Sequence, residues 1–257
     1  MTKTSSGHGL FWAALWALAS VSPASAQSSA SDQVSTQLWG NVILDFPKGE
    51  RWLFETDFEP QTQVSGGEKW WSMNFTPLVE YYPARWIDVV GETAFGYTHQ
   101  DDDFNTTELT PRVGFRFNLL SDLRERTGLL SGPLCRVRVG TLVRFEYRNL
   151  WYSDGSDPEH EWRLRIRLEA KIGINHANFA QDKSLYGIFD VEGFIPLSDG
   201  VSERYPSKVR VRAGLGYRLR YQTRFELLYI RDSHRDAPGS ANTPTSNTLD
   251  ARLKLFF

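Results

Sequence analysis

Apolar and polar residues alternate with a period of two along most of this chain, and helix-period patterns are almost absent. The clearest run covers residues 161–175, where Leu164, Ile166 and Leu168 share one parity and mostly charged residues fill the other. Successive side chains of a β-strand point to opposite faces, so such a segment has one apolar and one charged face. The pattern predicts an all-β protein.

Eleven segments carry this alternation, and several exceed the length of about five or six residues that is usual for soluble strands. They cover residues 36–45, 51–61, 69–81, 85–99, 105–119, 135–149, 160–175, 184–195, 207–221, 223–232 and 247–257. Tilted strands need about nine to eleven residues to cross the hydrocarbon of a bilayer. The lengths therefore favour a transmembrane β-barrel.

The connectors between these segments differ in length. Short turns are expected at residues 47–50, 82–84 and 220–222, and longer polar loops at residues 61–68, 100–104, 153–160, 196–206 and 233–246. Short turns at one end and long loops at the other are typical of outer-membrane barrels. Residues 121–133 are an exception, a longer connector at the short-turn end.

Composition narrows the protein class further. The chain has 29 Lys and Arg against 31 Asp and Glu, so a nucleic-acid partner has no bulk electrostatic support. Its one cysteine, Cys135, excludes an internal disulfide framework and a cysteine zinc cluster. No apolar stretch after residue 26 approaches the ~18 residues of a membrane-spanning helix. A periplasmic β-protein and an outer-membrane β-barrel are the two classes left.

Residues 1–26 have the organisation of a cleaved secretory signal peptide, which leaves residues 27–257 as the barrel. Lys3 precedes an apolar run at residues 10–19, and the small-x-small motif formed by Ala24, Ser25 and Ala26 ends at the expected cleavage site after residue 26. The apolar run is too short to span a bilayer as a helix. We therefore expect secretion through the inner membrane and, together with the barrel pattern, a location in the outer membrane.

A soluble β-sandwich would also alternate, with its apolar face in a core and its charged face in water. Aromatic residues near the strand ends favour the membrane barrel: Tyr82 and Trp86 lie beside short turns, and Trp70 and Trp162 beside long loops, as in interfacial girdles. The final residue, Phe257, is similar to the C-terminal signal read by the barrel-assembly machinery. We expect Phe257 to be an assembly signal and that machinery to be a partner.

We predict the strand number from a general rule for bacterial barrels rather than from the number of alternating segments. Single-chain bacterial barrels have an even number of antiparallel strands, whereas eleven segments are visible. One strand could be hidden at residues 27–34, or one segment could lie outside the wall. We predict an antiparallel transmembrane barrel of twelve strands, with ten as the alternative.

If the apolar face meets lipid, the charged face lines the lumen. The predicted lumen charge ladder comprises Glu55, Asp57, Glu59, Glu108, Arg112, Arg116, Arg136, Arg138, Arg144, Glu146, Arg148, Arg163, Arg165, Arg167, Glu169, Glu192, Arg210, Arg212, Arg218, Arg224 and Glu226. Acidic residues dominate the second to fourth segments and basic residues the fifth to ninth. An acidic wall should therefore face or adjoin a basic one.

Two interpretations of this ladder stay open. Charges removed from bulk water need partners, and the planar fork of arginine holds carboxylates bidentately, so the ladder could stiffen a closed barrel that acts as an envelope scaffold. Alternatively, walls of opposite charge set up a transverse field across a narrow, porin-like pore that selects small charged solutes.

Catalytic and metal chemistry have weaker support. His99, His160 and His234 lie near long loops, and Ser233 precedes His234, so an outer-leaflet lipid-modifying enzyme with a rim histidine is an alternative. The acidic loops at residues 100–103 and 154–157 lack EF-hand spacing, and a surface-binding module that uses them is a further alternative. We assign no catalytic residue, metal or cofactor, and expect outer-membrane lipid as the main partner.

Several motifs in the second half of the chain carry a family resemblance. They are WRLRIRLE at residues 162–169, YGIFDVEGF at 186–194, RVRAGLGY at 210–217 and FELLY at 225–229, together with Leu38-Trp39 near the start of the first segment. These motifs resemble a family of bacterial outer-membrane barrels known only as a domain of unknown function. The resemblance implies a Gram-negative outer-membrane location. It supplies no activity, so no functional residue carries over.

Overall fold

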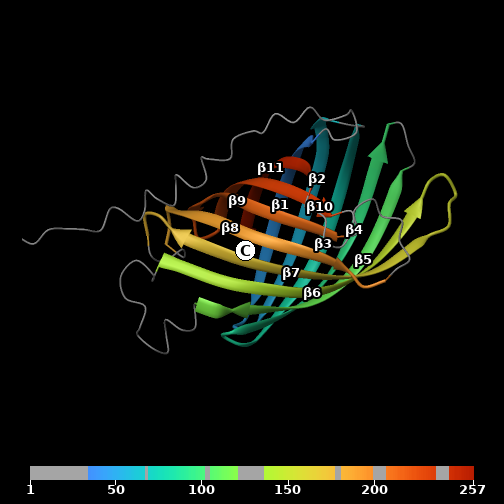
Figure 1. The fold of residues 1–257 in the computed structure, drawn as a ribbon. Coiled ribbons are helices and arrows are strands. Elements are labelled where there is room, and N and C mark those ends of the chain that lie inside the picture. The colour runs from blue at the N-terminus through green and yellow to red at the C-terminus, as the bar shows by residue number, and fades with distance from the viewer. Residues whose placement is uncertain are drawn as a thin grey trace, which may run out of the picture. The chain divides into compact units, whose positions relative to one another are not determined.

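The alternating segments form one closed all-β barrel (Figure 1). A computed structural model describes residues 34–66, 69–101, 105–120, 136–176, 181–198, 207–235 and 243–257. The strands are β1 (Ser35–Lys48), β2 (Trp52–Ser65), β3 (Trp70–Ala84), β4 (Ile87–Gln100), β5 (Thr106–Asn118), β6 (Val137–Tyr152), β7 (Glu159–Gly173), β8 (Ser184–Pro196), β9 (Ser207–Arg220), β10 (Thr223–Arg235) and β11 (Thr243–Phe256). Each strand pairs with its neighbours in chain order, so the prediction of an all-β barrel is confirmed.

The predicted strand number is wrong. The described residues form eleven strands, one for each segment with alternating residues, rather than twelve or ten. An odd number gives the first and last strands the same direction, and β1 pairs with β11 in parallel from Ser35 opposite Ser246 to Asp45 opposite Phe256. The error came from requiring antiparallel pairing at the seam where the barrel closes.

Some predictions fall on other parts of the chain. The expected signal peptide at residues 1–26, the candidate hidden strand up to residue 33 and the connector at residues 121–133 lie outside the described residues. No helix in the described ranges is long and apolar enough to span a membrane.

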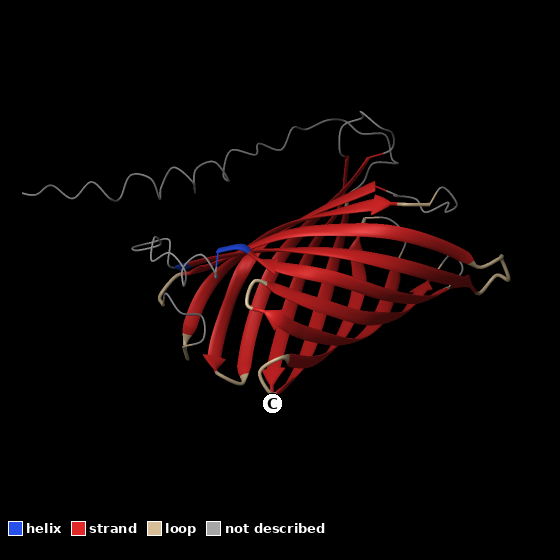
Figure 2. Ribbon diagram, turned by 90° about the horizontal axis from the view of Figure 1, so that it is seen from below, coloured by secondary structure: helices blue, strands red, loops and turns tan. Residues whose placement is uncertain are grey.

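The strands run between two ends of the barrel (Figure 2), and the predicted difference between these ends is only partial: residues 119–136 after β5 and 174–183 after β7 connect strands at the same end as the short turns. Residues 49–51, 85–86 and 221–222 make tight turns at one end, here called the turn end. Strands β2, β4, β6, β8 and β10 end at the opposite end of the barrel, here called the loop end. Gly49 adopts a positive φ of 63° in its turn, a conformation that a residue without a Cβ reaches at no steric cost.

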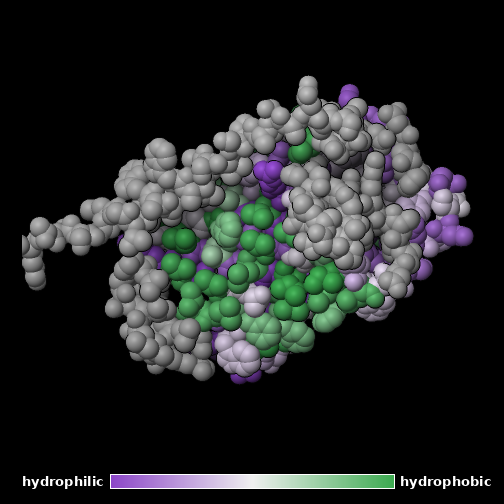
Figure 3. All heavy atoms as spheres, viewed as in Figure 1, coloured by the Kyte–Doolittle hydropathy of each residue, from purple (hydrophilic) through white to green (hydrophobic). Residues whose placement is uncertain are grey.

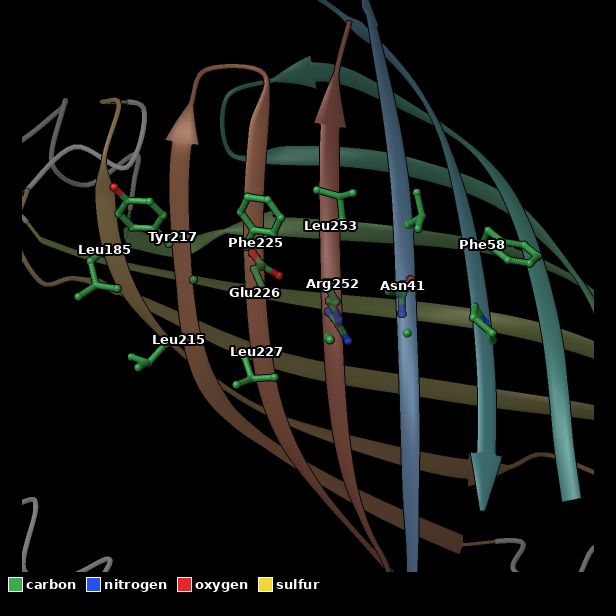
Figure 4. A pocket seen from close by; sticks show the side chains of 15 residues that line it. Asn41, Phe58, Leu185, Leu215, Tyr217, Phe225, Glu226, Leu227, Arg252 and Leu253 are labelled. Carbon is green, nitrogen blue, oxygen red and sulfur yellow. The ribbon is translucent and has the colours of Figure 1, made fainter. Parts of the chain in front are cut away.

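Every strand points apolar side chains away from the lumen. On β7, Ile166 is 41% exposed and Leu168 is 52% exposed, while Arg165 between Leu164 and Ile166 is buried. Figure 3 shows apolar side chains gathered over the barrel surface. On β10, Phe225 and Leu227 lie on the outer face and Glu226 on the inner face (Figure 4). Around these residues, a shallow apolar hollow of about 580 Å³ crosses β8, β9, β10, β11, β1 and β2.

A small apolar cluster lies inside the barrel. Its members are Trp39, Tyr186, Ile188, Leu228 and Ile230, from β1, β8 and β10. Two glycines on β9 make the room for it. A Cβ on Gly216 would lie 2.3 Å from the Tyr186 ring, and one on Gly214 would lie 2.6 Å from the Leu228 side chain. The glycines of the RVRAGLGY motif are thus needed for close packing against the wall.

Aromatic side chains pair near both ends of the outer surface. At the turn end Trp52 packs on Tyr81 at 4.6 Å between ring centres, and at the loop end Tyr147 packs on Trp162 at 4.7 Å. Consecutive residues on a strand cannot both face outward, however. Tyr82, next to Tyr81, lines the inner cavity, as does Trp70. These two residues therefore do not belong to the outer belts.

Candidate functional site

A cavity of about 870 Å³ lies inside the barrel. On β3 alone its lining residues run from Trp70 near the loop end to Tyr82 near the turn end, so it extends along nearly the whole strand. Charged side chains from β1 to β11 dominate the lining. We call this cavity the lumen and take it as the candidate functional site.

Most of the predicted ladder lines the lumen. The lining members are Glu55, Asp57, Glu59, Glu108, Arg112, Arg116, Arg138, Arg144, Arg148, Arg163, Arg165, Arg167, Glu169, Arg210, Arg212, Arg224 and Glu226. The period-two pattern alone places them on this face, because the strands continue without a shift in parity through the charged runs.

Four predicted members are placed differently. Glu146 and Glu192 point inward but lie beneath arginine side chains, with no exposed surface. Arg218 is buried near the turn end, where its guanidinium lies 5.6 Å from the centre of the Tyr221 ring. Arg136 precedes β6 and donates a hydrogen bond of 2.9 Å to the backbone oxygen of Ile174, outside the lumen lining.

The strand register alternates charge across four neighbouring strands. Glu92 on β4 lies opposite Arg112 on β5, which lies opposite Glu146 on β6, which in turn lies opposite Arg163 on β7. Opposite charges directly across from each other stabilise neighbouring strands. The register thus converts charges on separate strands into one connected row.

This row continues into a network that holds like charges together. Arg144 on β6 and Arg165 on β7 are direct cross-strand neighbours, an arrangement that is unfavourable by itself. Glu146 neutralises both, at 3.4 Å from Arg144 Nε and 2.7 Å from Arg165 Nη1. Glu92 also pairs with Arg144, and Glu192 lies 2.9 Å from Arg165 Nη2. We call these five residues the central network.

Burial makes the central network sensitive to the loss of any one member. The desolvation of two charges can offset their attraction, so a buried pair is not by itself a source of stability. Removing one partner is different, because it leaves an uncompensated charge in a low-dielectric site. The network therefore fixes the arrangement of the arginines around the lumen.

An acidic strip lines the lumen on β2 and comprises Glu55, Asp57 and Glu59. Asn41 on β1 donates a hydrogen bond of 2.7 Å to Glu59. In the ring of eleven strands, β2 and β7 are separated by five positions one way and six the other, so they lie on opposite sides. The acidic strip therefore faces the arginine-rich wall that includes Arg165.

Nine charged residues of the described lumen lining are not in the predicted ladder: Asp45, Glu80, Glu92, Lys171, Asp190, Lys208, Asp232, Arg252 and Lys254. Six of them lie on the charged parity of their strands, which already places them inside, whereas Asp45, Lys208 and Asp232 were missed. Asp45 follows inward-facing residues that are mostly uncharged, and Asp232 follows Leu228 and Ile230, which are apolar although they point inward. On both strands, the inward-facing positions before the aspartate therefore do not form a run of charged residues that would mark it as part of the lumen. Lys208 is the second residue of β9, and its parity with Arg210 and Arg212 was the available signal.

The candidate histidines do not form a catalytic group in the described residues. His99 Nδ1 lies 2.8 Å from Asn105 Oδ1 and its Nε2 lies 3.5 Å from Asp101. His160 Nδ1 lies 2.9 Å from Asn149 Oδ1. Both described rings thus contact amide or carboxylate oxygens rather than a serine hydroxyl. The His234 backbone belongs to β10, but its side chain is outside the described part.

The acidic loops give little support for a cation site. Asp154 accepts hydrogen bonds from the hydroxyl and the backbone N–H of Ser156, at 2.5 and 2.9 Å, and these bonds lower the pKa of its carboxyl group. Its oxygens are thus used within the loop itself. Within the described ranges, no group of three or more His, Cys, Asp or Glu side chains is arranged to hold a metal ion.

A comparison with known protein families matches nearly the same residues as those that form the barrel. Residues 36–243, from β1 to the start of β11, match the family described as "Protein of unknown function (DUF2490)". The chain belongs to this family. The resemblance to an uncharacterised family is confirmed at that level, and the DUF2490 description names no activity and no cellular location. A comparison with curated proteins gives no match.

Proposed function

We propose that this DUF2490 protein is an outer-membrane barrel of a Gram-negative bacterium whose lumen conducts small charged solutes. One observation carries the proposal: a closed barrel has its apolar side chains outside and its charged side chains inside, around a continuous cavity. This is the reverse of a water-soluble protein.

The outer surface supports the membrane part of the proposal. Large apolar residues are exposed on every strand, including Phe58 on β2, Phe95 on β4 and Leu215 on β9. Soluble monomers rarely expose contiguous apolar patches above a few hundred Å². The aromatic pairs near both ends match the girdles found at the two interfaces of a bilayer.

The closed hydrogen-bond ladder supports the same location. In hydrocarbon every backbone polar group needs an internal partner, and a closed barrel provides one for each strand. An odd strand number departs from the even counts of single-chain bacterial barrels. An odd-numbered mitochondrial barrel shows, however, that such a fold can span a membrane.

The two walls of the lumen support the transport part. The acidic strip on β2 faces the arginine-rich wall on β5 to β9 across the lumen, so a solute between them experiences a transverse field. Such a field favours charged solutes over neutral ones of equal size. A rigid scaffold needs neither a continuous cavity nor separated walls of opposite charge.

Single-channel recording in planar bilayers tests the proposal. The purified barrel should give discrete conductance steps, and Thr76→Trp, on the lumen face of β3, should reduce their size. Phe75→Trp is the matched control, because Phe75 is the next residue and faces outward. A protein that inserts into the bilayer but never conducts would contradict the proposed channel. The envelope scaffold would then remain as the function.

A further inference from the structure

Four cationic side chains surround one aromatic ring on the loop side of the lumen. The guanidinium carbons of Arg165, Arg163 and Arg210 lie 4.5, 5.1 and 5.5 Å from the centre of the Phe194 ring, and Lys208 Nζ lies 5.9 Å from it. All five residues line the lumen. We call this group the Phe194 cluster.

The strand register builds the Phe194 cluster. Phe194 on β8 lies directly between Arg165 on β7 and Lys208 on β9. The face of an aromatic ring attracts cations, so the ring lets several positive groups converge on one place. The ring itself is buried, and the cationic groups lie around it.

The carboxylates that neutralise these cations lie behind them. Asp232 Oδ2 is 2.8 Å from Lys208 Nζ and Asp232 Oδ1 is 2.8 Å from Arg210 Nε, yet the Asp232 side chain is only 2% exposed while that of Lys208 is 30% exposed. Glu146 and Glu192, the partners of Arg165, are buried as well. A solute in the lumen therefore contacts ammonium and guanidinium groups before it contacts the carboxylates.

The same asymmetry holds for most ion pairs of the lumen, because a short carboxylate stays near the wall while a long arginine reaches over it. Arg148 with Glu108 and Lys171 with Glu169 are exceptions. Among the described residues that line the cavity, fifteen are Lys or Arg and eleven are Asp or Glu. The lining therefore carries an excess of positive groups.

We infer that the lumen prefers anions and binds small oxyanions such as inorganic phosphate at the Phe194 cluster. The inference rests on the proposed function, because the solute must be able to enter the lumen. Guanidinium and ammonium groups donate the charge-assisted hydrogen bonds that phosphate and carboxylate oxygens accept. A cation approaching the same place meets like charge, since the compensating carboxylates are covered.

Reversal potentials of the purified barrel in a KCl gradient test the preference. We expect the potential to follow chloride, and Lys208→Gln to lower the chloride-to-potassium permeability ratio. Lys69→Gln removes the same charge from an exposed position at the loop end that does not line the lumen, and should leave the ratio unchanged. A conducting channel that prefers potassium would overturn the inference while leaving the proposed channel intact.

Calorimetric titration of the detergent-purified barrel with inorganic phosphate tests the site without conduction. We expect saturable binding, weakened about tenfold in Lys208→Gln by the loss of one charge-assisted hydrogen bond. Lys69→Gln should bind as the parent protein does. If the barrel is silent in bilayers but binds phosphate in this way, the channel fails and the anion site stands. Absence of saturable binding, or equal binding by both variants, would overturn the anion site.

Discussion

Glu146 on β6 lies directly opposite Arg163 on β7, and its carboxylate oxygen is 2.7 Å from Arg163 Nη2. The glutamate side chain has no exposed surface, whereas the arginine retains 12%. The acid is therefore held against the barrel wall and the base forms the lumen surface. This relationship explains why the lumen surface is more positive than the balanced composition of the chain suggests.

Replacing Glu146 should destabilise the barrel strongly. Glu146→Gln keeps the shape but removes the buried negative charge that Arg144, Arg163 and Arg165 share, so we expect a loss of about 3–5 kcal/mol in the free energy of unfolding. Denaturant unfolding in lipid vesicles measures it. Glu169→Gln is the control, since Glu169 is 38% exposed in its pair with Lys171 and should cost about 0–1 kcal/mol. Equal losses would contradict the role of the central network.

A charge on the outer surface should cost more at mid-strand than at a strand end. Ile166→Arg places a guanidinium in the middle of β7, where an arginine facing hydrocarbon costs about 2–4 kcal/mol. Val64→Arg introduces the same group near the loop end of β2 and should cost about 0–1 kcal/mol. Unfolding in vesicles compares the two variants. No dependence on position would contradict a lipid-facing surface.

The parallel seam predicts a specific crosslink. Leu38 on β1 and Leu249 on β11 are register partners on the outer face, one strand spacing apart. In a Cys135→Ser background, Leu38→Cys with Leu249→Cys should form a disulfide that a gel-shift assay detects.

The control for the seam uses the next strand. Tyr229 on β10 pairs with Leu249, so Leu38→Cys with Tyr229→Cys spans two spacings, about 9.5 Å, and should not crosslink. A twelfth strand between β1 and β11 would move Leu38 and Leu249 equally far apart. The absence of a crosslink between these two positions would therefore contradict closure by eleven strands.

The strands were predictable from sequence because each has one uniform outer face. Leu164, Ile166 and Leu168 fix the parity of β7 without any knowledge of its neighbours. How the barrel closes was not predictable in this way. Pairing of β1 with β11 depends on residues far apart in the chain, and no local pattern distinguishes a parallel seam from an antiparallel one.

The charged lining was partly predictable for the same reason. Parity places Arg163, Arg165 and Arg167 on the inner face, but ion pairing depends on register, which a parity pattern leaves open. The Phe194 cluster was missed because Phe194 is an apolar residue on an inward position. Its role becomes visible only when Lys208 and Arg165 lie beside it.

The central claim is that the apolar face of each strand meets lipid. Single cysteines at residues 164–169 of β7, each carrying a fluorophore, test it most directly in vesicles whose acyl chains carry a bromine quencher. We predict strong quenching at positions 164, 166 and 168 and weak quenching at 165, 167 and 169. Equal quenching at all six positions, the reverse alternation, or a protein that stays dissolved in buffer without detergent would contradict the account.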